Sequence, residues 1–146
     1  MGKRVRPKSS DTFASEVRRQ FGPTAIEWGM DDPVEDDLVI PGIAFTLGRL
    51  TYDWMLDPRE GELAVAVRLV VAEGTVHAWL EDLVTGGGLG VARDVRRSAR
   101  TWHAMQLAIA SQAAWLTRLH PMLTSPAAQE FMERAGARTS TPDLEG

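Results

Sequence analysis

The feature that most constrains the fold is a strict alternation of side chains between Glu62 and Val71. One face of this segment is apolar throughout, with Leu63, Val65, Val67, Leu69 and Val71, and the other carries Glu62, Ala64, Ala66, Arg68 and Val70. A period of two residues indicates a β-strand with one buried face. The segment before it repeats this pattern and places Leu50, Tyr52, Trp54 and Leu56 on one face.

A third alternating segment, 75–84, follows a turn at Glu73-Gly74. Val76, Ala78, Leu80 and Val84 would face the core, and His77, Trp79 and Glu81 the other side. The first turn contains Pro58 and Gly61, residues that tight connections favour. Three sequential strands joined by short turns predict an antiparallel β-meander.

Apolar side chains after residue 98 change to a helical period and form a stripe of Trp102, Met105, Ile109, Leu116 and Leu119. We expect a helix from Ser98 to Leu119, ended by His120-Pro121. Shorter helices are expected at 12–20, ended by Gly22-Pro23, and at 125–136, with Ser125 as N-cap. The predicted fold class is therefore α+β, an antiparallel meander with the long helix packed on it.

The chain has 146 residues, the size of one domain, and no cysteine. We divide it into a basic tail (1–10), a single α+β domain (11–138) and a polar tail (139–146). The lack of cysteine excludes disulfides and thiolate sites, and with only three histidines we expect no metal site. No segment reads as a signal peptide or a membrane span, so we expect a cytoplasmic protein without a membrane partner.

Charge is divided unevenly along the chain. The first ten residues carry four basic and no acidic side chains, so the net charge of −4 leaves −8 on the remainder. An acidic body disfavours nucleic acid, but the basic residues 1–10 could contact phosphate, unless they are a solvated tail. Five carboxylates between Asp31 and Asp37 are interpreted as a solvated acidic loop.

Four glycines, Gly86, Gly87, Gly88 and Gly90, follow the third predicted strand and precede the long helix. Backbone N–H groups between a strand and a helix N-terminus can hold the anionic group of a ligand. The alternative is a flexible turn that links sheet to helix. Arg93, Arg96, Arg97 and Arg100 gather just before that helix, where they would bind an anion or pair with the acidic loop.

Three side chains on the outer face of the third strand are candidates for function. Glu81 would be a general base if burial raised its pKa; otherwise it is solvated or pairs with Arg68. Trp79 points away from the apolar face, so we expect it, with His77, to lie under a second layer or to line a pocket or a partner surface.

Two segments resemble the GNAT acetyltransferase superfamily. Leu80-Glu81-Asp82-Leu83-Val84 is similar to the strand before the pyrophosphate loop of that family, and residues 125–138 are similar to its last helix. The resemblance implies a GNAT-like fold over residues 45–138 that binds acetyl-CoA or another acyl-CoA. The glycines and Arg97 would then hold the cofactor, and Glu81 would be the base.

The sequence departs from the family in its catalytic residues. The glycine loop lacks the preceding Arg or Gln, the usual tyrosine of the last helix is Met132, and the aromatic after Gly136 is Ala137. The leading hypothesis is therefore an acyl-CoA-binding domain, which is either a non-catalytic member of the family or an acyltransferase. One rival is a non-enzymatic phage or mobile-element assembly protein, which would contact a protein partner or a second copy through the strand face of Trp79 and the acidic loop. The other is a nucleic-acid accessory protein, which would use residues 1–10 and the arginines between Arg93 and Arg100.

Overall fold

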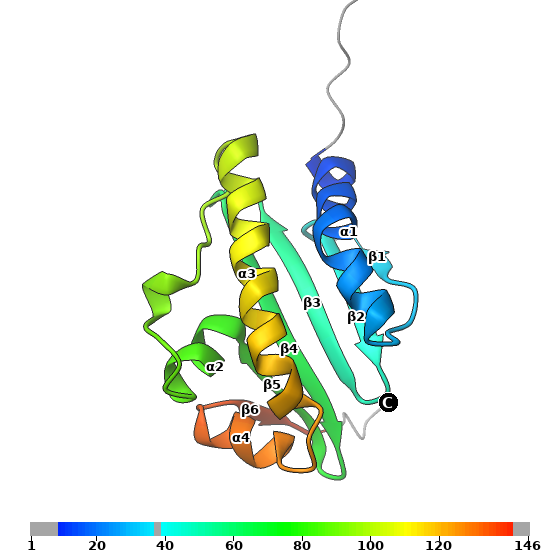
Figure 1. The fold of residues 1–146 in the computed structure, drawn as a ribbon, viewed down its shortest axis with the longest axis vertical. Helices are drawn as coiled ribbons and strands as arrows, with labels where there is room; N and C mark the ends of the chain where they lie inside the picture. The colour runs from blue at the N-terminus through cyan, green and yellow to red at the C-terminus, as the bar shows by residue number, and fades with distance from the viewer. Residues whose placement is uncertain (1–8, 37–38, 142–146) are drawn as a thin grey trace, which may run out of the picture.

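A six-stranded antiparallel sheet forms the centre of the molecule in the computed structural model, which describes residues 9–36 and 39–141 (Figure 1). The strands follow one another in chain order: β1 (Val34–Asp36), β2 (Gly42–Leu47), β3 (Leu50–Asp57), β4 (Glu62–Val71), β5 (Gly74–Trp79) and β6 (Arg138–Ser140). The α+β class and the antiparallel meander are thus confirmed. Both edge strands have three residues, which limits the backbone open to pairing with another chain.

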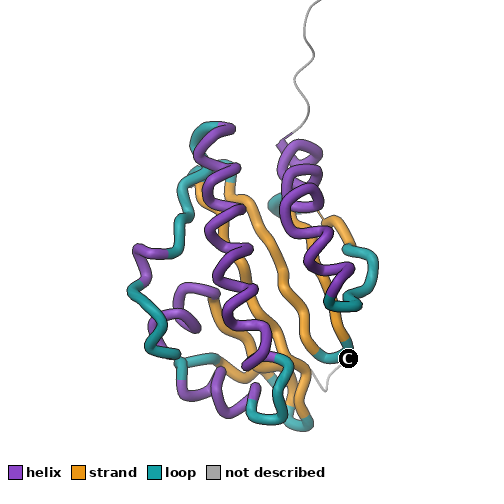
Figure 2. Tube along the Cα trace, viewed as in Figure 1, coloured by secondary structure: helices purple, strands orange, loops and turns teal. Residues whose placement is uncertain are grey.

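Two long helices, α1 (Ser9–Glu27) and α3 (Trp102–Leu123), lie side by side across one face of the sheet (Figure 1). Two short helices, α2 (Leu80–Gly86) and α4 (Ala128–Arg134), pack near the lower end of α3. Figure 2 shows that the long connection between α2 and α3 runs along the side of α3 that is away from α1. It contains one turn of 3₁₀-helix, η1 (Ala92–Asp94).

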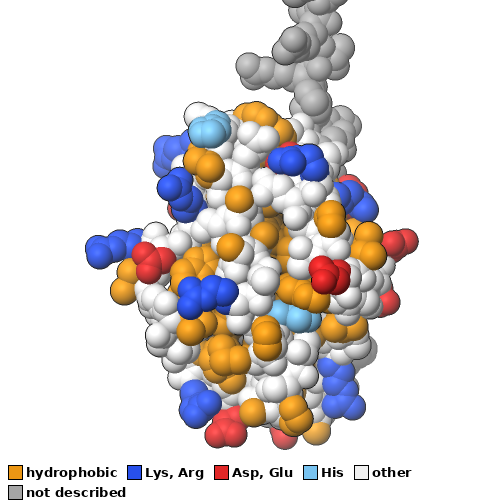
Figure 3. All heavy atoms as spheres, in the orientation of Figure 1, with side chains coloured by type: hydrophobic (Ala, Val, Ile, Leu, Met, Phe, Trp, Pro, Cys, Tyr) orange, Lys and Arg blue, Asp and Glu red, His pale blue; other side chains and the backbone are white. Residues whose placement is uncertain are grey.

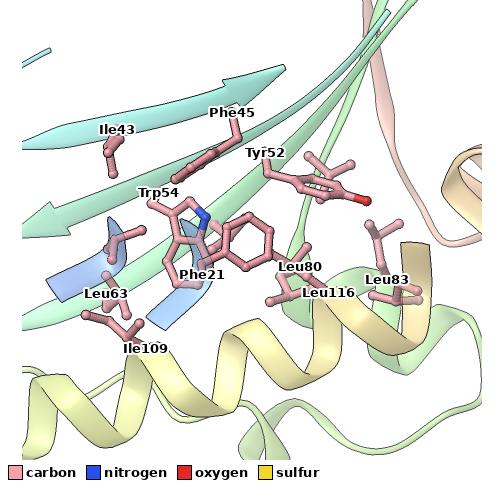
Figure 4. Close-up of a cluster of buried hydrophobic side chains, with 14 of the residues drawn as sticks. Phe21, Ile43, Phe45, Tyr52, Trp54, Leu63, Leu80, Leu83, Ile109 and Leu116 are labelled. Carbon is pink, nitrogen blue, oxygen red and sulfur yellow. The ribbon is translucent and has the colours of Figure 1, made fainter. Parts of the chain in front are cut away.

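The core lies between the two long helices and the sheet. Tyr52, Trp54 and Phe45 project from the sheet towards Phe21 of α1, and Leu116 of α3 completes this cluster (Figure 4). The ring of Phe21 lies 5.1 Å from that of Phe45 and 5.3 Å from that of Trp54, within the range of favourable aromatic contacts. Every second residue of β3 is buried, as the alternation predicts.

The helices begin and end at other residues than the local signals predict: α1 is longer, α3 is shifted by four residues, and α4 is shorter than the expected 125–136. α1 continues through Gly22 and Pro23, because Phe21 and Ala25 on either side are buried against the core. It ends instead before Gly29, whose φ of 79° suits a glycine. α3 begins at Trp102, capped by the hydroxyl of Thr101, and includes Pro121 near its end. The expected boundaries at Ser98 and Leu119 are therefore wrong.

The predicted strand 75–84 ends five residues early. Residues 80–86 form α2, because Leu80, Leu83 and Val84 are buried together with helical spacing. Strands β1 and β2 were not predicted, although Ile43, Phe45 and Leu47 alternate before Gly48. The expected polar tail begins inside β6, which extends the sheet beyond β5; residues 1–8 and 142–146 lie outside the described part.

Candidate interaction surface on the open sheet face

One face of the sheet, here called the open face, points away from α1 and α3. It consists of the residues of β2–β5 that alternate with the buried ones: Ala44, Thr46, Thr51, Asp53, Met55, Glu62, Ala64, Ala66, Arg68, Val70, Thr75, His77 and Trp79. All of them are partly or largely exposed. An antiparallel sheet tolerates such a face, because only one side has to pack on the core.

Trp79 divides the open face into two hollows. The first, the basic hollow, has a volume of about 460 Å³ and is lined by Ala66, Arg68, His77, Trp79, Asp82 and Arg138, among others. The second, the acidic hollow, has about 420 Å³ and is lined by Met55, Asp57, Glu60, Glu62, Trp79 and Arg97, among others. Trp79 itself is 45% exposed, as its place in the alternation predicts.

The strand register explains the charge of the basic hollow. His77 lies directly opposite Arg68 on β4 and directly opposite Arg138 on β6. Arg68 has a counter-charge, since its Nη2 lies 3.3 Å from Oδ2 of Asp53. Burial raises the pKa of Asp53, while Arg68 lowers it and Asp36 raises it again. In the described part of the chain, no ion pair is seen for Arg138.

Arg97 neutralises part of the negative charge of the acidic hollow. Its guanidinium lies 2.5 Å from Oε2 of Glu62 and 3.5 Å from Oε1 of Glu81. The other oxygen of Glu81, Oε2, is buried and has no hydrogen-bond partner among the residues that the structure describes. Two carboxylates therefore share one arginine beside Trp79, and the charge of Asp57 and Glu60 remains on the rim.

Backbone pairing with β4 fixes the position of Arg97. The N–H of Leu63 donates to the carbonyl of Arg97, and the N–H of Ala99 donates to that of Gly61, both at 2.7 Å. The buried side-chain amide of Gln112 donates to the carbonyls of Leu63 and Arg96 and so joins α3 to both segments. The segment just before α3 thus pairs with the start of β4, along the edge where β5 does not reach.

The structure brings together three residues predicted from different segments: Trp79, Glu81 and Arg97. Glu81 reaches this place from the first turn of α2, not from a strand, so its expected position on the face of Trp79 is wrong. Its partner is Arg97 and not Arg68, which pairs with Asp53. His77 lies on the other side of Trp79, in the basic hollow.

The glycine run has a different position from the one expected. Gly86 ends α2 and Gly87 caps its C-terminus, so the glycines follow a helix instead of a strand. The N–H groups of Gly87, Gly88 and Leu89 already donate to the carbonyls of Leu83, Thr85 and Val84. Three of the expected anion donors are therefore engaged, at the negative end of the helix dipole.

Packing gives a physical reason for two of these glycines. A Cβ on Gly86 would lie 2.5 Å from Cα of Ala135, and one on Gly87 would lie 3.0 Å from the ring of Phe131. The absence of side chains thus allows α2 to approach the segment around α4. Packing is therefore a sufficient reason for glycine at both positions.

The arginines before α3 do not form one cluster. Arg93 lies in η1 and Arg96 in the following segment, both exposed, and Arg100 packs its side chain near Gly61. In the acidic loop, Glu35 pairs with Arg18 of α1, at 2.8 Å, and not with an arginine before α3. Residues 37 and 38 lie outside the described part.

Sequence reasoning missed several charged residues of these hollows, among them Asp57, Glu62 and Arg138. Glu62 and Arg68 occupy the same face of β4, a signal present in the alternation itself. Arg138 was assigned to the end of the domain, and only its pairing with β5 brings it beside His77. No local pattern indicates that pairing, because 61 residues separate the two positions along the chain.

The helix-covered face carries a second polar feature, buried between α1 and α3. His120 stacks on Trp28, with ring centroids 3.6 Å apart, and its Nδ1 lies 2.7 Å from the hydroxyl of Tyr52. Burial lowers the pKa of His120 and raises the pKa of Tyr52.

Figure 3 shows the outer surface of the helix-covered face, where basic and acidic side chains are dispersed among hydrophobic ones and form no patch of one sign.

Comparisons with known proteins identify no relative of this chain. The chain matches no family model, no curated protein and no solved structure. No described group of three or more His, Asp or Glu residues is placed to hold a metal ion. Among the helices described, none is long and apolar enough to cross a membrane.

Proposed function

We propose that this chain is a non-enzymatic protein-interaction module that binds a partner through the open face of its sheet. The observation that carries the proposal is Trp79, which stands 45% exposed between two hollows of opposite charge. Tryptophan and arginine are enriched among the residues that dominate binding energy at protein interfaces. A large aromatic flanked by charged pockets supplies both buried area and orientation.

The arrangement of the titratable groups also favours binding over catalysis. Glu81, the expected base, lies 3.5 Å from the guanidinium of Arg97 and is engaged in an ion pair. His120 is buried against Tyr52 and Trp28, where a substrate does not reach it. In the described residues, no serine or threonine hydroxyl is hydrogen-bonded to a histidine ring, as an activated nucleophile would be; Thr124 donates to the backbone carbonyl of His120.

Two other functions stay predictions. Acyl-CoA binding follows from the GNAT resemblance, and the engaged N–H groups of the glycine run give it no support. Nucleic-acid binding was assigned to residues 1–10, of which 1–8 lie outside the described part. An assembly or accessory role in a phage or mobile element is compatible with an interaction module.

Site-specific cross-linking tests the proposed function. A photo-reactive phenylalanine analogue at Thr75, on the open face, should yield one dominant cross-linked protein in cells of the source organism. The same analogue at Leu107, which is 39% exposed on α3, is the matched control. We expect the product at Thr75 to disappear when Trp79 is replaced by serine.

The identity of the product then needs a direct check. The cross-linked protein, identified by mass spectrometry and purified, should bind the wild-type chain at least ten times more tightly than Trp79→Ser. Equal products from Thr75 and Leu107, or equal affinities, would contradict an interaction surface on the open face.

A further inference from the structure

We propose that the partner on the open face is a second copy of this chain, which gives a dimer with twofold symmetry. This inference rests on the proposed function and names its partner. A symmetric dimer uses the same patch on both subunits, so the patch must be complementary to itself. The open face has this property.

The pattern of β4 shows the self-complementarity. Its open side reads Glu62, Ala64, Ala66 and Arg68, with opposite charges about 20 Å apart at the two ends and two small residues between them. When two such strands face each other in opposite directions, Glu62 of each copy lies over Arg68 of the other. The twofold axis then passes between Ala64 and Ala66.

The neighbouring strands agree with this axis. The acidic hollow lies at the end of the sheet that carries Glu62, and the basic hollow lies at the end that carries Arg68. Because the axis reverses the strand direction, the acidic end of each copy lies over the Arg68 end of the other. Asp57 and Glu60 then face the end of the sheet that carries Arg68 and Arg138. Glu62 and Arg68 of the two copies meet with opposite charges, which favours this orientation over a parallel one, where Glu62 would lie over Glu62.

Side-chain size allows the two sheets to approach. Ala64 and Ala66 at the centre leave room for Trp79 of the partner copy, whose exposed ring would be buried there. Packing of this kind buries the large aromatic at the middle of the interface and leaves the charged side chains at its rim, the usual anatomy of a protein interface.

The area is sufficient for a specific dimer of moderate affinity. The four strands β2–β5 are ~19 Å wide and β3, with eight residues, is ~26 Å long, so each copy offers ~500 Å². Two copies bury ~1,000 Å², the lower limit for a specific interface. We therefore expect a dimer that dissociates on dilution.

The existing ion pairs hold the interacting groups in place. Arg68 is 46% exposed and its partner Asp53 27%, and Arg97 and Glu62 are 44% and 41% exposed. Each side chain is thus oriented by a neighbour in its own chain and still accessible to a group from outside. In the dimer, each pair gains a further charged neighbour from the other copy.

Sedimentation velocity of the full chain between 5 and 300 µM tests the dimer. Wild type should change from monomer to dimer over this range. Arg68→Glu and Glu62→Arg should each raise the dissociation constant at least tenfold, because both symmetric contacts then join like charges. Arg134→Glu, on the exposed side of α4, is the control and should behave as wild type.

Mixing the two variants gives the decisive result. In a heterodimer of Arg68→Glu with Glu62→Arg, one contact joins the reversed charges and the other is native, so an equimolar mixture should dimerise. The double variant should dimerise by itself for the same reason, and circular dichroism checks that each variant is folded. Restoration in this way is specific to a twofold contact between these residues.

Three results would overturn the dimer. They are a wild type that stays monomeric at 300 µM, single variants that dimerise like wild type, and a mixture that stays monomeric although both singles are folded. If wild type is monomeric while cross-linking at Thr75 identifies another protein, the dimer is wrong and the interaction module stands. If neither partner is found, both proposals are wrong.

Discussion

At the scale of single residues, His120 links three parts of the fold. It belongs to α3, stacks on Trp28 just after α1, and contacts the hydroxyl of Tyr52 on β3. A neutral ring suits this position, because burial lowers the pKa of His120 and the Tyr52 hydroxyl is uncharged. Protonation would place a charge among aromatic rings, at a cost in stability.

This position predicts a dependence of stability on pH. Below about pH 6.5 an unfolded chain binds a proton on this histidine, while the folded chain does not until lower pH. The free energy of unfolding should therefore fall as the pH falls from 7.5 to 5, measured by urea denaturation. His120→Gln should reduce this slope, and His103→Gln, exposed on α3, should leave it unchanged. Equal slopes for wild type and His120→Gln would contradict the assignment.

The sequence patterns predicted which face of a strand a side chain occupies better than they predicted which residue it contacts. The alternation correctly placed Trp79 on the side away from the core, since a strand fixes which face each residue occupies. It placed Glu81 wrongly, because the period changes from strand to helix at residue 80. The partner of Glu81 is Arg97, 16 residues further along, and no spacing rule connects them.

At the scale of elements, the short helix α2 depends on its glycines. Gly86 touches the backbone of Ala135, and Gly87 lies against Phe131 of α4. These contacts link the two ends of the C-terminal half. The same glycines made the segment resemble a phosphate-binding turn, because sequence alone does not distinguish a glycine needed for packing from one needed for ligand approach.

Substitution at one of these glycines tests this packing. Gly86→Ala should destabilise the protein by ~1–3 kcal/mol, because its Cβ would lie 2.5 Å from Cα of Ala135 and backbone must shift. Gly22→Ala is the matched control: its Cβ meets nothing within 4 Å in the middle of α1. There alanine should stabilise by ~0.5–1 kcal/mol. Urea unfolding measures both, and a neutral Gly86→Ala would contradict the packing argument.

At the scale of the whole molecule, one layer of helices covers one face of the sheet and the other face carries the hollows. This division separates the buried His120 from the exposed Trp79. Stability and binding are thus assigned to opposite sides of the same strands. A surface substitution such as Arg134→Glu should change neither.

Thermal unfolding of the whole molecule tests the acyl-CoA prediction. A ligand present at 100 times its dissociation constant stabilises the folded state by ~2.7 kcal/mol, which raises the melting temperature by several degrees. Acetyl-CoA at several hundred micromolar should produce this shift if the resemblance extends to cofactor binding. Adenosine is the control for weak binding by the base alone. An unchanged melting temperature would contradict an acyl-CoA site.

The sequence by itself determined the meander, the buried face of each main strand and the outward position of Trp79. These follow from a period of two residues, which local sterics impose on any strand. Only the tertiary structure decided where β5 gives way to α2, why α1 continues through Gly22-Pro23, and which residues meet beside Trp79. Each depends on burial or pairing between segments far apart in the chain, and such contacts leave no periodic signal in the sequence.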